Sequence, residues 1–184
     1  MAFSTLPTPL YALYQARDGF PAFTITVIFA VYALGVLTSL YLVGPVSDWL
    51  GRRPILLAAI TVELLSAAVF LLWSSVPGLI AARFLCGIGV GAITPAATAH
   101  IAELRAAGLP GSDPRRSATL SSFVNIGGLS LGPLIAGIIA EYGPAPLIAP
   151  YIVFLILLVP CWLAILPVPE TVQPATRPVY RPQR

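Results

Sequence analysis

The sequence has no lysine and few charged residues of any kind. Only 9% of its 184 residues are charged, whereas 58% are hydrophobic, and the mean hydropathy is +0.90. Soluble globular domains carry about 25% charged residues, so this composition excludes an ordinary soluble protein. The arginines are scattered among short polar stretches and form no basic face, so the net charge of +3 does not indicate a nucleic-acid partner.

Cysteine and histidine are equally scarce. The two cysteines, Cys86 and Cys161, lie inside apolar runs, and His100 is the single histidine. This set provides neither a disulfide framework nor a metal site, and we expect no cofactor. The sequence also lacks the paired aspartates, the His-Glu-x-x-His motif and the Ser-His pair of intramembrane enzymes. We therefore predict no catalytic residues and no enzymatic activity.

Long apolar runs separated by short polar stretches dominate the chain. A bilayer core of about 30 Å requires roughly 20 apolar residues per helix, and five runs meet this requirement. These five predicted spans are Ala22 to Val43, Ile55 to Trp73, Gly78 to Ala102, Ala118 to Ala140 and Leu147 to Leu166. The expected fold class is therefore an all-α, polytopic membrane helical bundle.

The arginines predict the orientation of these spans. Eight arginines fall in alternate loops or in the tail and share one side of the membrane, whereas Arg17 alone lies on the other side. Basic residues are retained on the cytoplasmic side, so the larger group should face the cytoplasm of a cell with this protein in its plasma membrane. Residues 167–184 are rich in Pro and Arg, and we expect a disordered cytoplasmic tail there.

A polar segment, GPVSDWLGRR, separates the first two predicted spans. It resembles the loop between helices 2 and 3 of major facilitator superfamily (MFS) transporters, whose signature is G-x-x-x-D-x-x-G-R-R. The matching residues are Gly44, Asp48, Gly51, Arg52 and Arg53. A carboxylate here can accept hydrogen bonds from a helix N-terminus, and a glycine can adopt a turn closed to other residues. The resemblance implies a cytoplasmic gate, the alternative being that the arginines are only topology anchors and Gly51 only a turn.

Two ionisable residues lie inside the predicted spans. Arg83, in the stretch RFLCGIGVG, resembles the helix 4 motif of proton-coupled members of the same family, and this resemblance implies a coupling role. An intramembrane arginine costs about 2.5 to 3.5 kcal/mol on insertion scales, so it should face a partner or a wet cavity unless it snorkels to the external interface. Glu63 could pair with Arg83, or remain protonated in a structural role. Both are candidates for proton coupling.

The stretch GLSLGPLIAG resembles the helix 5 motif G-x-x-x-G-P-x-x-G-G of the drug and proton antiporter branch. Its residues are Gly128, Gly132, Pro133 and Gly137, and Ala136 replaces one glycine with another small residue. Close helix packing and a proline bend are both compatible with this pattern. A generic contact between small residues is the alternative, but it accounts less well for the proline.

The resemblance covers nearly the whole chain and implies the N-terminal half of an MFS transporter. Residues 1–21 would be the end of helix 1 and an external loop, residues 22–166 helices 2 to 6, and residues 167–184 a shortened central linker. The implied activity is alternating-access transport of a small molecule, as proton-coupled efflux, with a complementary C-terminal half completing the cavity. We expect a truncated half that is inactive alone, and the alternative is a membrane remnant, partner subunit or scaffold without transport activity.

Overall fold

The computed structural model describes residues 1–108 and 114–171, and the side chains of residues 44–49 and 114 lie outside that description. All regular secondary structure in these ranges is helical. The helices are α1 (Ala2–Thr5), α2 (Pro7–Asp18), α3 (Ala22–Leu50), α4 (Arg52–Leu72), α5 (Val76–Gly108), α6 (Pro114–Tyr142) and α7 (Ala149–Ile165). The predicted all-α helical bundle is confirmed.

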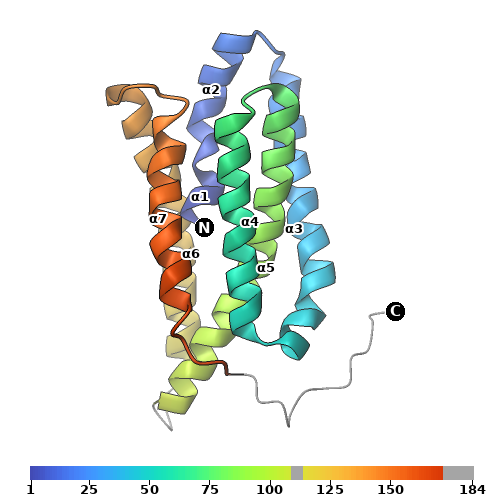
Figure 1. Cartoon of the computed structure of the whole chain (residues 1–184), viewed down its shortest axis with the longest axis vertical. Coiled ribbons are helices and arrows are strands. Elements are labelled where there is room, and N and C mark those ends of the chain that lie inside the picture. The colour runs from blue at the N-terminus through green and yellow to red at the C-terminus, as the bar shows by residue number, and fades with distance from the viewer. Residues whose placement is uncertain (109–113, 172–184) are drawn as a thin grey trace.

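The five long helices run alternately up and down the bundle, as their short connections require (Figure 1). α5 packs most extensively, against α3 on one side and α4 on the other. α6 and α7 form a second group, which joins the rest because α7 packs against α4 and α6 packs against α5. α1 and α2 occupy the upper half of the bundle between these groups (Figure 1).

Among the described residues, four helical segments are long and apolar enough to cross a membrane. They are Ala22–Val43, Arg52–Leu72, Val76–Gly108 and Arg115–Tyr142. The fifth predicted span is a shorter apolar helix, Ala149–Ile165, of 17 residues, because turns occupy the proline-containing stretch before it. A helix of that length rises about 26 Å, which is at the lower end of what a bilayer core needs.

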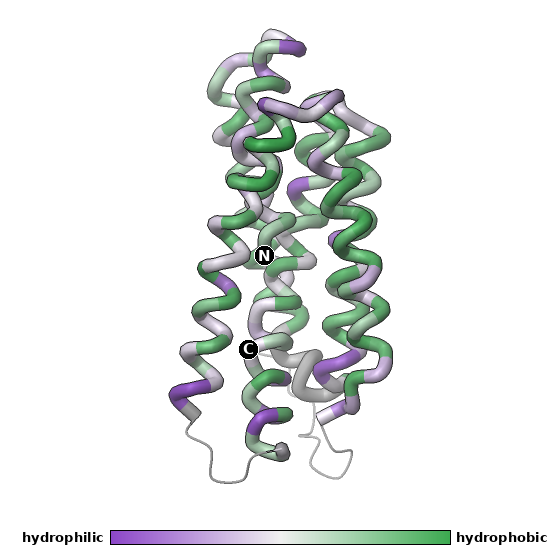
Figure 2. The backbone as a smooth tube through the Cα atoms, turned by 90° about the vertical axis from the view of Figure 1, so that its left-hand side faces the viewer, coloured by the Kyte–Doolittle hydropathy of each residue, from purple (hydrophilic) through white to green (hydrophobic). Residues whose placement is uncertain are grey.

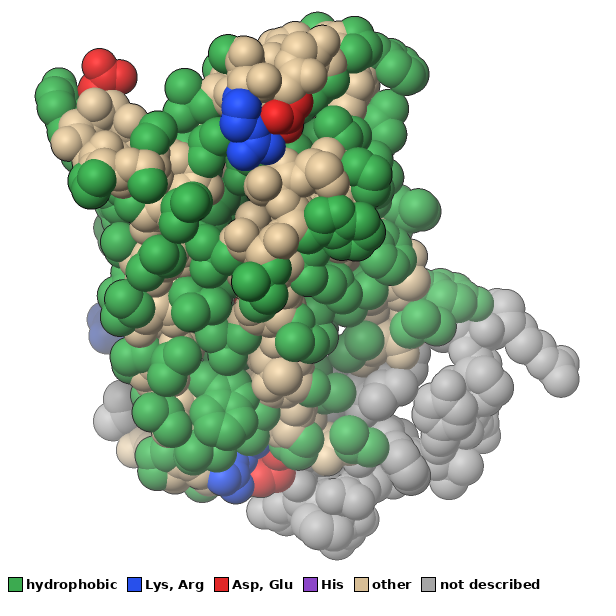
Figure 3. Space-filling view, turned by 45° about the horizontal axis from the view of Figure 1, so that its top comes forward, with side chains coloured by type: hydrophobic (Ala, Val, Ile, Leu, Met, Phe, Trp, Pro, Cys, Tyr) green, Lys and Arg blue, Asp and Glu red, His purple; other side chains and the backbone are tan. Residues whose placement is uncertain are grey.

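The outer surface of the bundle is apolar along most of its length. Hydrophobic residues dominate the helices in Figure 2, and the strongly hydrophilic ones lie mainly near the two ends. The face in Figure 3 likewise shows hydrophobic side chains between charged groups that gather mostly toward its ends. Large side chains such as Phe23, Leu72 and Phe123 are more than two-thirds exposed, at 74%, 87% and 77%. Such a surface suits contact with lipid rather than water.

The first residues of the chain belong to the core. Leu6 and Leu10 are fully buried, and Phe3 packs its ring against Phe70 of α4 and Phe154 of α7 at centroid distances of 6.4 Å. The apolar residues of α1 and α2 therefore connect the two groups of long helices.

Glycines form a close crossing of α3 and α5. A Cβ on Gly35 would lie 2.5 Å from the carbonyl oxygen of Phe84 and 3.2 Å from the Cα of Gly87. Neither distance leaves room for a side chain, so the absence of one at Gly35 and Gly87 lets the two backbones meet.

The sequence predicted a loop between the first two spans, and this prediction is wrong because most of the segment is helical. α3 continues to Leu50 and α4 begins at Arg52, so Gly51 alone interrupts the helices. Its φ of +112° is a backbone conformation that glycine adopts without steric cost. A single glycine therefore replaces the expected polar loop, and the turn predicted at Gly51 is confirmed.

Candidate functional site

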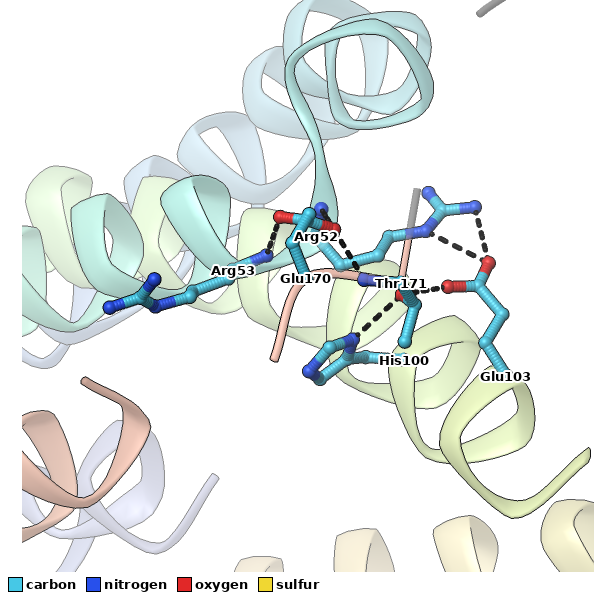
Figure 4. A network of polar contacts seen from close by, with 6 residues as sticks. All are labelled: Arg52, Arg53, His100, Glu103, Glu170 and Thr171. Carbon is cyan, nitrogen blue, oxygen red and sulfur yellow. Dashed lines mark hydrogen bonds and ion pairs between the residues drawn. The ribbon is translucent and has the colours of Figure 1, made fainter. Parts of the chain in front are cut away.

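The turn at Gly51 exposes the N-terminus of α4, where the first backbone N–H groups have no partner within the helix. The carboxylate of Glu170 occupies this position: Oε1 accepts a hydrogen bond from the N–H of Arg52 and Oε2 one from the N–H of Arg53, each at 3.0 Å (Figure 4). A Cβ on Gly51 would lie 2.5 Å from Oε2 of Glu170. Glycine thus provides both the turn and the space for a carboxylate at the positive end of the helix dipole.

The two arginine side chains extend this contact to other elements. Nε and Nη2 of Arg52 both donate to Oε1 of Glu103 at 3.2 Å, which links α4 to α5. Nη2 of Arg53 donates to the carbonyl oxygen of Leu166, directly after α7. The start of α4 is therefore tied to α5 by an ion pair and to the end of α7 by a hydrogen bond.

A threonine hydroxyl completes the network. Thr171 donates from Oγ1 to Oε2 of Glu103, and Nδ1 of His100 lies 3.0 Å from the same Oγ1 (Figure 4). Because the hydroxyl proton is directed at Glu103, the histidine must donate Nδ1–H to the threonine oxygen. The chain of hydrogen bonds runs from His100 through Thr171 and Glu103 to Arg52, and we call these residues, with Arg53 and Glu170, the end network.

The end network includes two of the predicted gate residues, Arg52 and Arg53, and a third, Gly51, forms the turn beside it. The other two, Gly44 and Asp48, lie in α3 with side chains outside the described residues. Glu170 and Thr171 were not predicted, because the Pro-rich composition placed them in the tail. The sequence signal that could have identified Glu170 is its position as an isolated acidic residue shortly after the last apolar run. The remainder of that predicted tail, residues 172–184, lies outside the description.

Arg83 is enclosed by the core and does not reach the external interface. Its side chain is 1% exposed, Nε donates to the hydroxyl of Tyr11, and Nη1 donates to the carbonyl oxygen of Ser4 at 2.5 Å. The guanidinium also lies over three rings, at 5.3 to 5.4 Å from the centroids of Tyr11, Phe29 and Tyr32. Desolvated cation–π contacts of this kind stabilise a buried guanidinium. Arg83 thus joins α5 to α1, α2 and α3.

Glu63 does not form the ion pair with Arg83 that the sequence allowed. Its carboxyl group is 3% exposed, and neither oxygen has a hydrogen-bond partner among the described residues. Gly89 of α5 lies directly against it, since a Cβ there would fall 2.6 Å from Oε1. The two ionisable residues of the spans are therefore in different surroundings.

The predicted helix-bend motif of α6 makes contact with α1. A Cβ on Gly132 would collide with the carbonyl oxygen of Ala2 and the hydroxyl of Thr5, and one on Gly128 would lie 2.9 Å from the Cβ of Met1. Pro133 lies inside the helix, and Gly137 has no atom within 4 Å of the corresponding position. Gly128 and Gly132 therefore act in close packing, and the bend itself stays a prediction.

The opposite end of the bundle carries a second polar contact. The guanidinium of Arg17 donates to both oxygens of Asp18, at 2.6 and 2.7 Å, and from Nη2 to the carbonyl oxygen of Ser74 at 2.7 Å. Hydrogen bonding from Arg17 lowers the pKa of the exposed Asp18 carboxyl. This contact fixes the end of α2 to the connection between α4 and α5.

The described residues contain no group of three or more His, Cys, Asp or Glu side chains that could hold a metal ion. The end network consists of hydrogen bonds and an ion pair between separate helices. Interactions of this type can break and reform when helices move, so the arrangement suits a conformational latch.

Comparison with known proteins agrees with these features. The family model described as Major Facilitator Superfamily matches residues 1–181. Multidrug transporter MdfA of Yersinia pestis bv. Antiqua (strain Angola) is 39% identical over 72 residues, which cover 39% of this chain and 18% of that relative. Chloramphenicol resistance protein CraA of Acinetobacter baumannii is 30% identical over 111 residues, which cover 60% of this chain and 26% of that relative.

These matches span only a minor part of the length of either relative. The family model, in contrast, extends over nearly all of the chain. The chain therefore belongs to the Major Facilitator Superfamily, and as a member of this transporter family it is a multi-pass membrane protein and not an enzyme.

Proposed function

We propose that this chain is one helical half of an alternating-access transporter that exports a small organic molecule in exchange for protons. The observation that carries the proposal is the end network, in which Glu170 binds the N-terminus of α4 and Arg52 pairs with Glu103. A latch at one end of a helical half is what rocking between two states requires, because it holds one state until it is broken.

The direction of transport and the substrate class are supported by two further observations. The α6 stretch from Gly128 to Gly137 resembles the motif of drug and proton antiporters. The two relatives carry the names multidrug transporter and chloramphenicol resistance protein. We propose drug-like organic molecules as substrates, the plasma membrane as the location, and a complementary half as the partner that completes the cavity. The end network would then face the cytoplasm, as the arginine distribution predicts.

Drug accumulation in cells tests this proposal. The chain is expressed together with a complementary C-terminal half, which the proposal requires, in a bacterial host that lacks its main drug exporters. Accumulation of chloramphenicol and ethidium is then measured with and without a protonophore. We expect lower accumulation than in cells with an Arg52→Ala variant expressed at the same level, and we expect the protonophore to abolish the difference. The conservative Arg52→Lys variant should recover part of the export, since lysine keeps the charge but not the paired donors.

Equal accumulation in cells with the chain, the variant or an empty vector would contradict transport by this chain. It would favour the alternative of a scaffold or partner subunit. A difference in accumulation that persists with the protonophore would support transport but contradict proton coupling.

A further inference from the structure

Glu63 is the one carboxyl group that the described residues bury inside the bundle without an N–H or O–H donor, and the weakly donating thiol of Cys86 lies beside it. Glu63 lies on α4 with 3% of its surface exposed, and both of its oxygens are unpartnered. An ionised carboxylate without an N–H or O–H donor and without an ion pair is strongly unfavourable in an apolar interior, and Arg83 and the amino group of Met1 act on Glu63 only from beyond ion-pair distance. In this conformation the group is therefore held as the neutral acid.

A cavity of about 240 Å³ adjoins Glu63. Its walls come from α1, α4, α5 and α7, and Glu63 is the single ionisable carboxyl group among apolar side chains and one thiol. The lining includes Phe3, Ile93, Phe154, Leu157 and Cys161. Liquid water occupies about 30 Å³ per molecule, so the space is large enough for water, and the Glu63 carboxyl group is the polar partner that would hold it there. Leu157 and Cys161 are exposed on α7, which places one wall of the cavity at the surface of the bundle.

The position of the carboxyl group is defined by a glycine. Gly89 presents bare backbone to Glu63, and a Cβ there would lie 2.6 Å from Oε1 and 2.9 Å from the carboxyl carbon. The neighbouring glycines Gly87 and Gly91 face α3 instead. Gly89 thus leaves room for the carboxyl group of Glu63, whereas Gly87 and Gly91 let α5 pack closely against α3.

Arg83 is unsuited to carry the proton itself. A guanidinium remains protonated under all physiological conditions, and this one is held by Tyr11, by the carbonyl of Ser4 and by three aromatic rings. It can supply a fixed positive charge, whereas the unpartnered carboxyl group can gain and lose a proton.

We propose that Glu63 is the residue that binds and releases the exchangeable proton in this chain, and that the proton passes through the cavity between α1, α4, α5 and α7. On release, the carboxyl O–H bond breaks, a cavity water accepts the proton, and a carboxylate remains. The titratable and charged groups that face Glu63 are Arg83 and Cys86 on α5, Tyr32 on α3, the amino group of Met1 and, across the cavity, Cys161. The use of this proton in export rests on the proposed function, but the proton site itself is independent of transport.

Labelling with dicyclohexylcarbodiimide tests the site without any transport measurement. This lipid-soluble reagent adds to protonated carboxyl groups in apolar surroundings. The purified chain in detergent is treated across a pH series, and modified peptides are identified by mass spectrometry. We expect modification at Glu63 that declines as the pH rises, that is absent in Glu63→Gln and that persists in Glu141→Gln, whose carboxyl group is exposed at the end of α6.

A second measurement does not depend on access by the reagent. Above the pH at which exposed carboxyl groups ionise, the infrared C=O band of a protonated carboxylic acid should remain in the wild-type chain and in Glu141→Gln and disappear as the pH rises further. Over the same pH range it should be missing in Glu63→Gln. Glutamine matches the neutral acid in size, so the variant should keep the wild-type helix content by circular dichroism. Modification of Glu63 should also slow maleimide labelling of Cys161, which lines the same cavity.

An unmodified Glu63 peptide at every pH, or a band unchanged in Glu63→Gln, would overturn the inference. If Glu63 titrates while the export assay shows no effect of the protonophore, the proton site stands and the proposed coupling fails. If export is proton-dependent but Glu63 neither reacts nor titrates, coupling stands and this assignment fails.

Discussion

The hydroxyl of Thr5 donates a hydrogen bond to the carbonyl oxygen of Leu129 at 3.0 Å. Leu129 lies four residues before Pro133, and a proline has no N–H to bond the carbonyl at that position. Thr5 supplies the missing donor from α1. Gly132 permits the approach, because any side chain there would collide with Thr5 and with the carbonyl of Ala2. The glycine and the proline of the α6 motif therefore act together as a docking site for the start of the chain.

We expect Thr5→Val to lower the free energy of unfolding by about 0.5 to 1.5 kcal/mol, the net value of one hydrogen bond. Valine keeps the shape of threonine but removes the donor. Chemical unfolding in mixed detergent micelles measures the change. Thr5→Ser retains the hydroxyl and should stay near wild type. Thr38→Val is the matched control, because its hydroxyl bonds only a carbonyl of its own helix, that of Leu34. Equal losses in both valine variants would contradict the role of Thr5.

The glycines of the α6 motif should differ in their sensitivity to substitution. Gly132→Ala forces a methyl group into the backbone of α1, and overpacking of this kind costs about 1 to 3 kcal/mol. Gly137→Ala has open space around the new methyl group and should be neutral or stabilising by up to about 1 kcal/mol, since alanine favours a helix more than glycine does. Thermal unfolding of the two variants under one condition compares them. A motif that served only to bend the helix would not separate them in this way.

These contacts show which parts of the molecule a sequence can reveal. The apolar runs predicted where the long helices lie, because hydropathy and the thickness of a bilayer act locally along the chain. They did not predict every end, since α3 continues past Val43 to Leu50. The surroundings of Arg83 could not be predicted, since Tyr11, Ser4 and Phe29 are far from it in sequence. Glu170 was missed for a related reason. The composition of residues 167–184 indicates a tail, and the role of Glu170 depends on the N-terminus of α4, which Gly51 places beside it.

Tyr11→Phe should destabilise the bundle by about 1 to 3 kcal/mol, because it leaves the buried Nε of Arg83 without its acceptor. The phenyl ring keeps its cation–π contact, so the variant isolates the hydroxyl. The midpoint of denaturant-induced unfolding, followed by circular dichroism, measures the loss. Tyr41→Phe on the exposed side of α3 should leave the midpoint unchanged. A wild-type midpoint in Tyr11→Phe would show that the aromatic rings and the carbonyl of Ser4 hold the guanidinium without the hydroxyl of Tyr11.

Removal of the Glu170 carboxylate should loosen the start of α4. Glu170→Ala deprives the N–H groups of Arg52 and Arg53 of their acceptor, and losing a helix N-cap costs about 0.5 to 2 kcal/mol. Amide hydrogen exchange of the peptide that contains Arg52 and Arg53 should become faster. Glu170→Gln retains an acceptor oxygen, so its exchange rate should lie between those of wild type and Glu170→Ala. Glu141→Ala at the end of α6 serves as the control. Unchanged exchange in Glu170→Ala would mean that the contact does not hold the end network together.

Substitution of Gly89, which contacts Glu63, should change the reactivity of Glu63 without a large change in the stability of the bundle. Gly89→Ala places a methyl group 2.6 Å from Oε1 of Glu63, and the flexible end of that side chain can move aside into the adjoining cavity. We therefore expect a several-fold faster reaction of Glu63 with dicyclohexylcarbodiimide and a small change in thermal stability. Gly91→Ala, on the same helix, meets the backbone of Val36 instead and should destabilise the α3 contact without changing the reactivity. The opposite pattern would mean that Glu63 does not lie on the open side of this glycine, and the proposed proton path would lose its geometric basis.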